Sequence, residues 1–358
     1  MVDLVSDQNH AYFAKSFNLN VPMKEPVETK KSWLSLAIGL LISAISIIML
    51  VWLIDVREAA HEISTADYKL VFFGGLGQVL FLVLRTFRWR FILNNQVSWP
   101  KVFHIQNIGY MLTMLLPFRL GDLIRAFLIG KVKPLNFMQG ASSMVLERIL
   151  DLLVIVIIFP FAISGLIELP NSVRLAANVA GVAAIVGVGV LIFMANMPGL
   201  VRQIATWILD RIPFFKTEIW LERLDGILVG LDSLTRFKST LYLLLISFII
   251  WIPIIYSYWI IMHAVGIPAT LSIAMYTVCI AAFGVALPSS PGQIGVFEAA
   301  VSLALVSVVG QSISATAASF GIIYHTVQFL LLLIVGIIGL VAQGESFGSV
   351  MRQTSEIR

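Results

Sequence analysis

Long apolar runs separated by short polar segments dominate the hydrophobic pattern of the chain. Each run has about the 20 residues that a helix needs to cross roughly 30 Å of hydrocarbon. A transmembrane barrel would instead show segments of about ten residues in which apolar and polar positions alternate. The pattern therefore predicts an all-α fold, a polytopic helical membrane bundle. We expect six full spans, at residues 33–54, 68–84, 149–167, 175–197, 241–264 and 315–341.

Two further apolar stretches, residues 102–130 and 269–309, are interrupted near their middles. The interruptions are residues 117–125 and 288–295, which contain prolines and glycines. Because proline removes a backbone donor and glycine weakens a helix, each stretch is predicted to form a helix, a turn and a second helix. In lipid, such a break is tolerated where the backbone is buried in protein or lines a polar cavity. We therefore predict two re-entrant hairpins. Two full crossings for each stretch are the alternative.

The composition excludes a soluble globular protein. Of the 358 residues, 59% are hydrophobic and 12% are charged, and the mean hydropathy is +0.93. An ordinary soluble domain is roughly 45–50% apolar and about 25% charged. The charged residues are too few to cover the surface of a water-soluble fold of this length.

Charge is distributed unevenly between the loops. The chain has 24 Lys and Arg against 20 Asp and Glu, and with six spans the basic loops all fall on one side, as the positive-inside rule expects. We therefore expect both tails, residues 1–32 and 343–358, to be cytoplasmic and the membrane to be the cell's inner (plasma) membrane. Residues 198–238 mix aromatic and basic side chains, which is typical of an amphipathic segment at the membrane surface. No nucleic-acid partner is expected.

Residue types that bind metals or cofactors are sparse. The single cysteine, Cys279, lies inside an apolar run, and no two of the five histidines stand three or four positions apart. No Walker A pattern is present either. We therefore expect no metal, no cofactor and no ATP hydrolysis.

Ionisable residues within or next to the apolar segments are the first candidate site. Such residues are costly in a membrane, so each needs a partner or a function. The candidates are Arg85, Arg88, Arg119, Asp122, Arg125, Glu147, Arg148 and Asp151. Arginine donates two hydrogen bonds to a phosphate and stays charged at any depth, so the group is consistent with a cationic pocket for an anionic head group. A structural ion-pair cluster is the alternative for the later residues, and topology anchoring for Arg85 and Arg88.

The second interrupted stretch offers a different kind of site. After Gly292 and Gly295 a helix is expected to restart, and a helix N-terminus presents free N–H groups and partial positive charge. Ser289 and Ser290 add hydroxyl groups, and Glu298 lies one turn into the new helix. The segment is a candidate for binding an anion or a polar lipid group. Glu298 is also a candidate for coupling to protons, with a purely structural role as the alternative.

Three motifs give the chain a recognisable resemblance. They are residues 117–125 (P-x-R-x-G-[ED]-x-x-R), 147–151 (with R-x-x-D at the start of a span) and 288–298 (P-x-x-P-G-x-x-G-x-x-E). In this order they resemble the lysylphosphatidylglycerol synthase transmembrane-region family, over about residues 33–342. Asp122 stands where glutamate is usual, and Thr113 and Met114 occupy a region where the family commonly has an asparagine.

The resemblance implies a flippase-like membrane domain that moves or presents a lipid between leaflets. Members of the family are associated with aminoacylated phosphatidylglycerol, hopanoids or polyprenol-linked intermediates. We expect a stand-alone member without an aminoacyltransferase domain. The leading hypothesis is therefore a lipid translocase and not an enzyme. The alternatives are a membrane enzyme that acts on a lipid-linked substrate, and a non-catalytic membrane partner of a lipid-synthesis enzyme.

Two structural expectations follow from these assignments. Both interruptions should face a shared cavity. In addition, Arg119 or Arg125 should form a close ion pair with Asp122, Glu147 or Asp151, because a lone guanidinium at that depth would be uncompensated.

Overall fold

The computed structural model describes residues 55–116, 120–166, 171–211, 235–286 and 290–350, with single residues in 41–48 and 217–228. These residues form helices and no strands, as the sequence predicts. The α-helices are α3 (Val56–Thr65), α4 (Tyr68–Ile92), α5 (Trp99–Leu115), α6 (Leu120–Gly130), α7 (Phe137–Ser164), α8 (Asn171–Asn196), α9 (Pro198–Leu209), α11 (Phe237–Ala264), α12 (Leu271–Ala286), α13 (Val296–Val309) and α14 (Ser314–Gln343). Two short 3-10 helices are η3 (Pro291–Gln293) and η4 (Gln311–Ile313).

Side-chain caps start several of these helices. Asp55 accepts hydrogen bonds from the first-turn N–H groups of α3, and Asp67 does the same for α4. At α7, Asn136 and Gln139 form a capping box. These contacts satisfy backbone donors that have no partner within the helix. The cap at Asp55 also helps to explain why α3 forms between the first two predicted spans.

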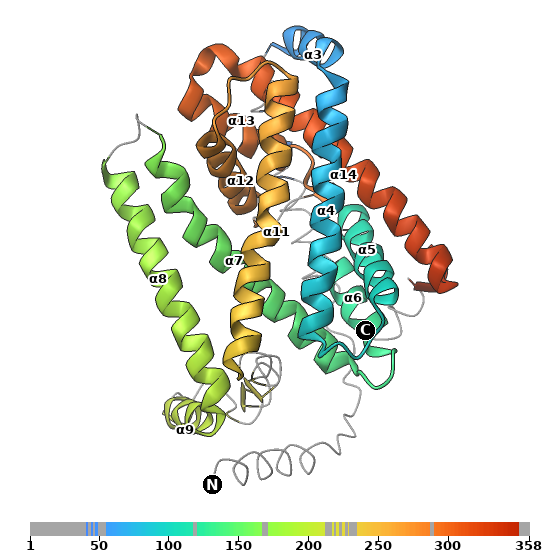
Figure 1. Ribbon diagram of the computed structural model, residues 1–358, viewed down its shortest axis with the longest axis vertical. Helices are drawn as coiled ribbons and strands as arrows, with labels where there is room; N and C mark the ends of the chain where they lie inside the picture. Colours follow the sequence, from blue (N-terminus) through green and yellow to red (C-terminus); the bar gives the residue numbers. More distant parts are fainter. Residues whose placement is uncertain are drawn as a thin grey trace.

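Helices α4 and α11 pack side by side at the centre of the bundle (Figure 1), with α7 and α8 on one side and α5 and α6 on the other. Glycines allow the central contact: a Cβ at Gly77 would lie 2.7 Å from the carbonyl oxygen of Pro253. Small residues at such contacts are typical of helix packing in membranes. Helix α14 crosses behind α4 and packs against α5.

Both interrupted stretches form pairs of helices. Helix α5 ends at Leu115 and packs against α6, and α12 packs against α13 after the second interruption. The predicted breaks are therefore confirmed, although residues 117–119 and 287–289 within them lie outside the described residues. At 1.5 Å per residue, helices of 11 to 17 residues are roughly 16–26 Å long.

Four segments of the described chain are long and apolar enough to cross a membrane: Tyr68–Ile92, Phe237–Ala264, Pro291–Val309 and Gln311–Gln343. The third of these includes η3 and the positive-φ residues Gly292 and Gly295, so its regular helix is only α13. The helices that contain most of the predicted spans 68–84 and 149–167 extend beyond them at one end, because α4 continues to Ile92 and α7 begins at Phe137. Most of the predicted span at 33–54 lies outside the described residues.

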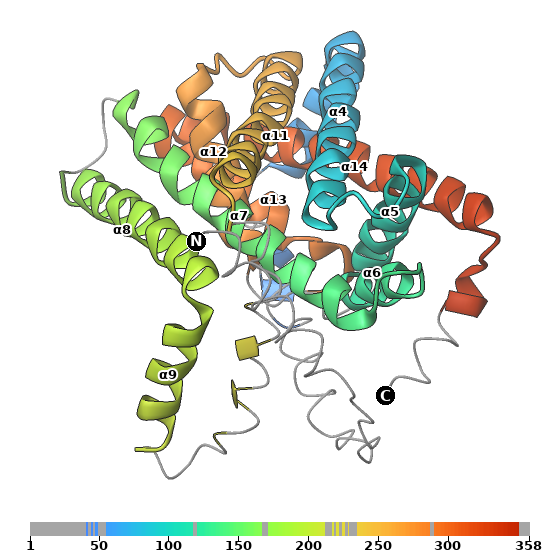
Figure 2. The ribbon, with the colours of Figure 1, turned by 60° about the horizontal axis from the view of Figure 1, so that its bottom comes forward.

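The two ends of the bundle differ. Helix α3 lies at one end and α9 at the other (Figure 1), and Figure 2 shows α9 projecting from the end of α8. No side chain of α9 is buried. Just after α9, the Arg211 guanidinium carbon lies 3.6 Å from the centre of the Trp207 ring. These features are those expected of the predicted surface segment 198–238, most of whose remaining residues lie outside the described part.

Candidate functional site

Five ionisable residues form a buried cluster. Helix α4 supplies Arg85 and Arg88, α6 supplies Arg125, and α7 supplies Glu147 and Asp151. Arg85 and Arg88 each donate to a different oxygen of Asp151 at 2.7 Å. Arg125 pairs with Glu147, whose other oxygen lies 3.5 Å from Arg88 and 3.9 Å from Arg85. The predicted pairing of Arg125 with a carboxylate is confirmed.

Helical spacing creates this arrangement. Arg85 and Arg88 are three residues apart, and Glu147 and Asp151 are four apart, so each pair lies on one face of its helix. Both arginines lie in the interior, with 7% of Arg85 and none of Arg88 exposed, so their pairing with carboxylates favours the site interpretation over topology anchoring. Gly109 on α5 leaves room for the third arginine: a Cβ there would lie 2.4 Å from Arg125 Cγ.

The cluster carries a net positive charge. Its three guanidinium groups face two carboxylates, and each carboxylate lies within 4 Å of two or more of them. Trp89 places its ring 4.2 Å from the Arg125 guanidinium carbon and donates to Ser143 Oγ at 2.9 Å. Nε and Nη1 of Arg125 are buried without a hydrogen-bond partner. The site therefore retains unused donors and one positive charge without a matching carboxylate.

A second ion pair lies beside the cluster. Arg148 Nη2 donates to both oxygens of Asp122, at 2.8 and 2.9 Å, and both side chains are partly exposed. Asp122 was one of three carboxylates expected to pair with Arg119 or Arg125, and among the described residues its partner is Arg148. Arg119 lies outside the described residues.

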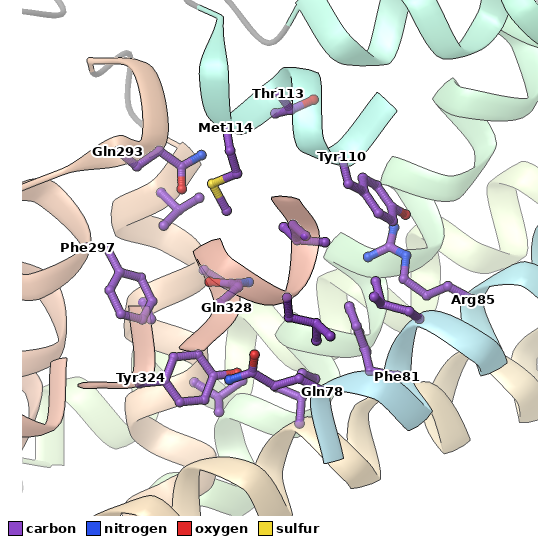
Figure 3. A pocket seen from close by; sticks show the side chains of 18 of the residues that line it. Gln78, Phe81, Arg85, Tyr110, Thr113, Met114, Gln293, Phe297, Tyr324 and Gln328 are labelled. Carbon is purple, nitrogen blue, oxygen red and sulfur yellow. The ribbon is translucent and has the colours of Figure 1, made fainter. Parts of the chain in front are cut away.

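A cavity of about 240 Å³ adjoins the cluster. Arg85 belongs to both, and among the described residues that line the cavity Arg148 is the other charged one. Thr113 and Met114 line it from the end of α5, and Gln293 from the second interruption. The described residues that flank the two breaks thus share one cavity, as predicted. In Figure 3, Arg85 and Tyr110 lie on one side of this space, and Gln293 and Phe297 lie on the other.

The second interruption is held by its own carboxylate. Glu298 Oε2 accepts from the Gly295 N–H at 2.8 Å, and Glu298 Oε1 lies 2.6 Å from His325 Nδ1 on α14. Gly292 and Gly295 have φ values of 70° and 85°, a conformation that glycine adopts without strain. The Gly295 N–H, one of the backbone donors expected to bind a ligand anion, therefore donates to Glu298 instead.

Of the two serine candidates in this interruption, the structure describes Ser290, which is not among the residues that line the cavity. Ser290 Oγ donates within its own turn, to the carbonyl oxygens of Pro291 and Ile294. Ser289 lies outside the described residues.

Comparison with known proteins gives the chain a family. The sequence profile of the family described as lysylphosphatidylglycerol synthase TM region matches residues 33–336. The chain belongs to this family. No solved structure matches the chain.

Two relatives of this family member are named proteins. Glycosyltransferase AglD of Haloferax volcanii is 23% identical over 89% of this chain. The match covers 56% of AglD, so the chain spans about half the length of that relative. A UPF0104 membrane protein of Methanothermobacter thermautotrophicus is 24% identical over 87% of this chain and 96% of its own length. The second match supports a stand-alone member of the lysylphosphatidylglycerol synthase TM region family.

Several residues around the site of this family member were missed by sequence reasoning. They are uncharged polar and aromatic residues of the apolar helices and of the second interruption. These residues are Gln78, Tyr110, Gln293, Tyr324, Gln328 and the Glu298 partner His325. The available signal was the presence of amide side chains within apolar helices, which are costly in lipid unless they face protein or a cavity.

Proposed function

We propose that the protein is a lipid translocase that moves an anionic or polar-headed lipid between leaflets. One observation supports this above all: a buried cluster with a net positive charge opens, through Arg85, onto a cavity between two broken helix pairs. Broken helices that meet at a polar cavity are typical of transporter sites. An anionic head group in the cavity would compensate the remaining charge while the acyl chains stay in the bilayer.

The short helices fit a re-entrant arrangement. Helices α6 and α13 have 11 and 14 residues, fewer than the approximately 20 needed to cross about 30 Å. In our proposal each hairpin enters and leaves the plasma membrane on one side, the two hairpins use opposite sides, and both chain termini are cytoplasmic. Movement is downhill, or is coupled to protons or to the membrane potential.

The proposal assigns transport and not catalysis to the site. Both oxygens of Asp151 and one oxygen of Glu147 pair with guanidinium groups, and the other Glu147 oxygen lies within 4 Å of Arg85 and Arg88. Both carboxylates are therefore ion-pair partners of arginines, which argues against a free general base. The name of AglD records a glycosyltransferase, but the match covers about half of that protein. The membrane-enzyme alternative predicts a chemically altered lipid, and the scaffold alternative predicts no lipid movement at all.

Reconstitution tests the proposal. The purified protein is placed in liposomes with a tail-labelled phosphatidylglycerol, and a membrane-impermeant quencher reports the label that reaches the outer leaflet. Wild-type protein should expose lipid faster than protein-free liposomes, and Arg85→Ala should reduce the rate by about ten-fold or more, because the cavity loses its charged donor. Arg57→Ala, which removes an exposed arginine of α3, is the matched control and should keep the wild-type rate.

Equal amounts of folded protein in each preparation are verified by gel filtration before the rates are compared. Wild-type rates no higher than those of protein-free liposomes would overturn the proposal. So would equal rates for Arg85→Ala and Arg57→Ala. Mass spectrometry of the recovered lipid identifies the enzyme alternative by a change in mass.

A further inference from the structure

The cavity has two chemically different ends. At one end, Arg85 lies against Tyr110, with its guanidinium carbon 5.3 Å from the ring centre. At the other end, Gln293 and Phe297 line the space from the second interruption and α13 (Figure 3). A ligand that fills the cavity therefore meets a cation at one end and neutral groups at the other.

The neutral end combines aromatic rings with amides. The rings of Phe297 and Tyr324 stack with their centres 5.8 Å apart, and Gln328 lies one turn beyond Tyr324 on α14. An amide has both donors and an acceptor, as a hydroxyl group does, so amides match a surface with several hydroxyl groups. Aromatic faces match the flat C–H face of a six-membered ring. Together these side chains suit a polyhydroxylated ring better than an acyl chain.

The backbone holds one of these amides in an unusual conformation. Gln293 has φ of 59°, in the left-handed region that residues other than glycine enter infrequently. Its N–H donates to the Ser290 carbonyl at 2.9 Å, which closes the turn. Such conformations cost energy and cluster at ligand sites, where the surrounding structure maintains them. The turn presents the Gln293 side chain to the cavity.

We propose, on the basis of the proposed function, that the preferred lipid carries a six-membered polyhydroxylated ring on a phosphodiester. The phosphodiester lies at Arg85, the ring packs on Phe297 and Tyr324, and the ring hydroxyls bond to Gln293 and Gln328. The volume of about 240 Å³ is below the roughly 300–1,000 Å³ of pockets for drug-sized ligands. It therefore suits a single ring, with the lipid chains outside. A hexosyl-phosphoryl polyprenol and a phosphatidylinositol share this chemistry.

Binding to the purified full chain in detergent tests the inference separately from transport. Native mass spectrometry compares a mannosyl-phosphoryl polyprenol, phosphatidylinositol, phosphatidylmethanol and phosphatidylcholine at equal concentration. Phosphatidylmethanol has the same charge as the ring lipids but no hydroxyl groups. Phosphatidylcholine tests whether the aromatic rings bind a cation instead. At least one ring lipid should bind about ten-fold more tightly than both of the others, because only it uses the two amides.

A paired substitution locates the preference. The double variant Gln293→Leu/Gln328→Leu should lower the affinity for the ring lipid to that for phosphatidylmethanol and leave phosphatidylmethanol binding unchanged. Gln343→Leu, at the far end of α14 and away from the cavity lining, is the matched control and should preserve the preference. Tighter binding by one ring lipid alone identifies the lipid anchor.

Equal or tighter binding of phosphatidylmethanol or phosphatidylcholine would overturn the inference, as would an unchanged preference in the double variant. Transport in liposomes separates this failure from a failure of the proposed function. Lipid movement without a ring preference overturns only the ring inference. A ring preference without movement overturns only the translocase.

Discussion

Three arginines share two carboxylates in the interior of this protein, so each carboxylate does more than neutralise one partner. Glu147 lies among Arg85, Arg88 and Arg125. Removing a carboxylate from such a cluster leaves buried charge uncompensated, which costs more than the loss of the ion pair itself. Removing a carboxylate from the cluster should therefore lower the free energy of unfolding more than removing an arginine.

We expect Glu147→Gln to lower the free energy of unfolding by about 3–5 kcal/mol, because buried guanidinium groups lose their shared partner. Asp122→Asn is the matched control. It breaks the partly exposed pair with Arg148 and should cost about 1 kcal/mol or less. Thermal unfolding of the detergent-solubilised protein measures both. Adding Arg125→Met to Glu147→Gln should recover part of the loss, and a double variant less stable than Glu147→Gln would contradict this account.

Asp151→Asn should reduce lipid movement by about ten-fold or more. The Asp151 carboxylate accepts hydrogen bonds from Arg85 and Arg88 at 2.7 Å and so fixes the orientation of both guanidinium groups, which the substitution would release. The liposome assay measures this at equal amounts of incorporated protein. Some loss of stability is expected, so the rates are compared at a temperature at which the variant remains folded. A folded Asp151→Asn protein with the wild-type rate would assign the cluster a purely structural role.

At the scale of elements, the sequence predicts the two breaks well because their causes are local. Several prolines and glycines close together interrupt a helix wherever they occur in a sequence. The breaks fall after Leu115 and Ala286. The extension of α4 to Ile92 was not predictable in the same way. Arginines at the end of an apolar run look like anchors until α7 supplies the carboxylate that pairs with them.

The packing of α5 on α6 depends on glycine. A Cβ at Gly121 would lie 2.0 Å from the Gly109 carbonyl oxygen and 2.3 Å from Thr113 Oγ1. We expect Gly121→Ala to lower the free energy of unfolding by about 1–3 kcal/mol, since the helices must separate. Gly187→Ala in α8 is the control, because nothing lies within 4 Å of the added Cβ. It should stabilise the helix, by about 1 kcal/mol at most. Equal effects in thermal unfolding would contradict the packing argument.

At the scale of the whole molecule, the cavity depends on residues far apart in the chain. Gln78 comes from α4, Gln293 from the second interruption and Gln328 from α14. Composition and hydrophobic runs predict the helical membrane class, and the ionisable residues within or next to the apolar segments, some of them in the motifs, predict the charged half of the site. Neither predicts which neutral side chains converge, because convergence depends on how α4, α5, α13 and α14 pack. The sequence therefore indicates the cationic half of the site and misses the neutral half.

If the protein moves lipid through this cavity, the two breaks must change position relative to each other, as alternating access requires. Met114 and Gln293 line the cavity from opposite breaks, and a Cβ at Gly292 would lie 3.4 Å from the Met114 carbonyl oxygen. We expect a short bis-methanethiosulfonate reagent, which joins the two thiols through reducible disulfides and releases methanesulfinate, to cross-link Met114→Cys to Gln293→Cys and to stop lipid movement, with recovery after reduction. The native Cys279 is buried and can stay in place.

Each single-cysteine variant, treated with the same reagent, controls for simple blockage of the cavity and should keep most of its rate. Mass spectrometry of the intact protein gives the cross-linked fraction, so the rate can be compared with it directly. A fully cross-linked protein that moves lipid at the untreated rate would show that the two breaks need not separate. Alternating access by movement of the two breaks would then be wrong for this protein.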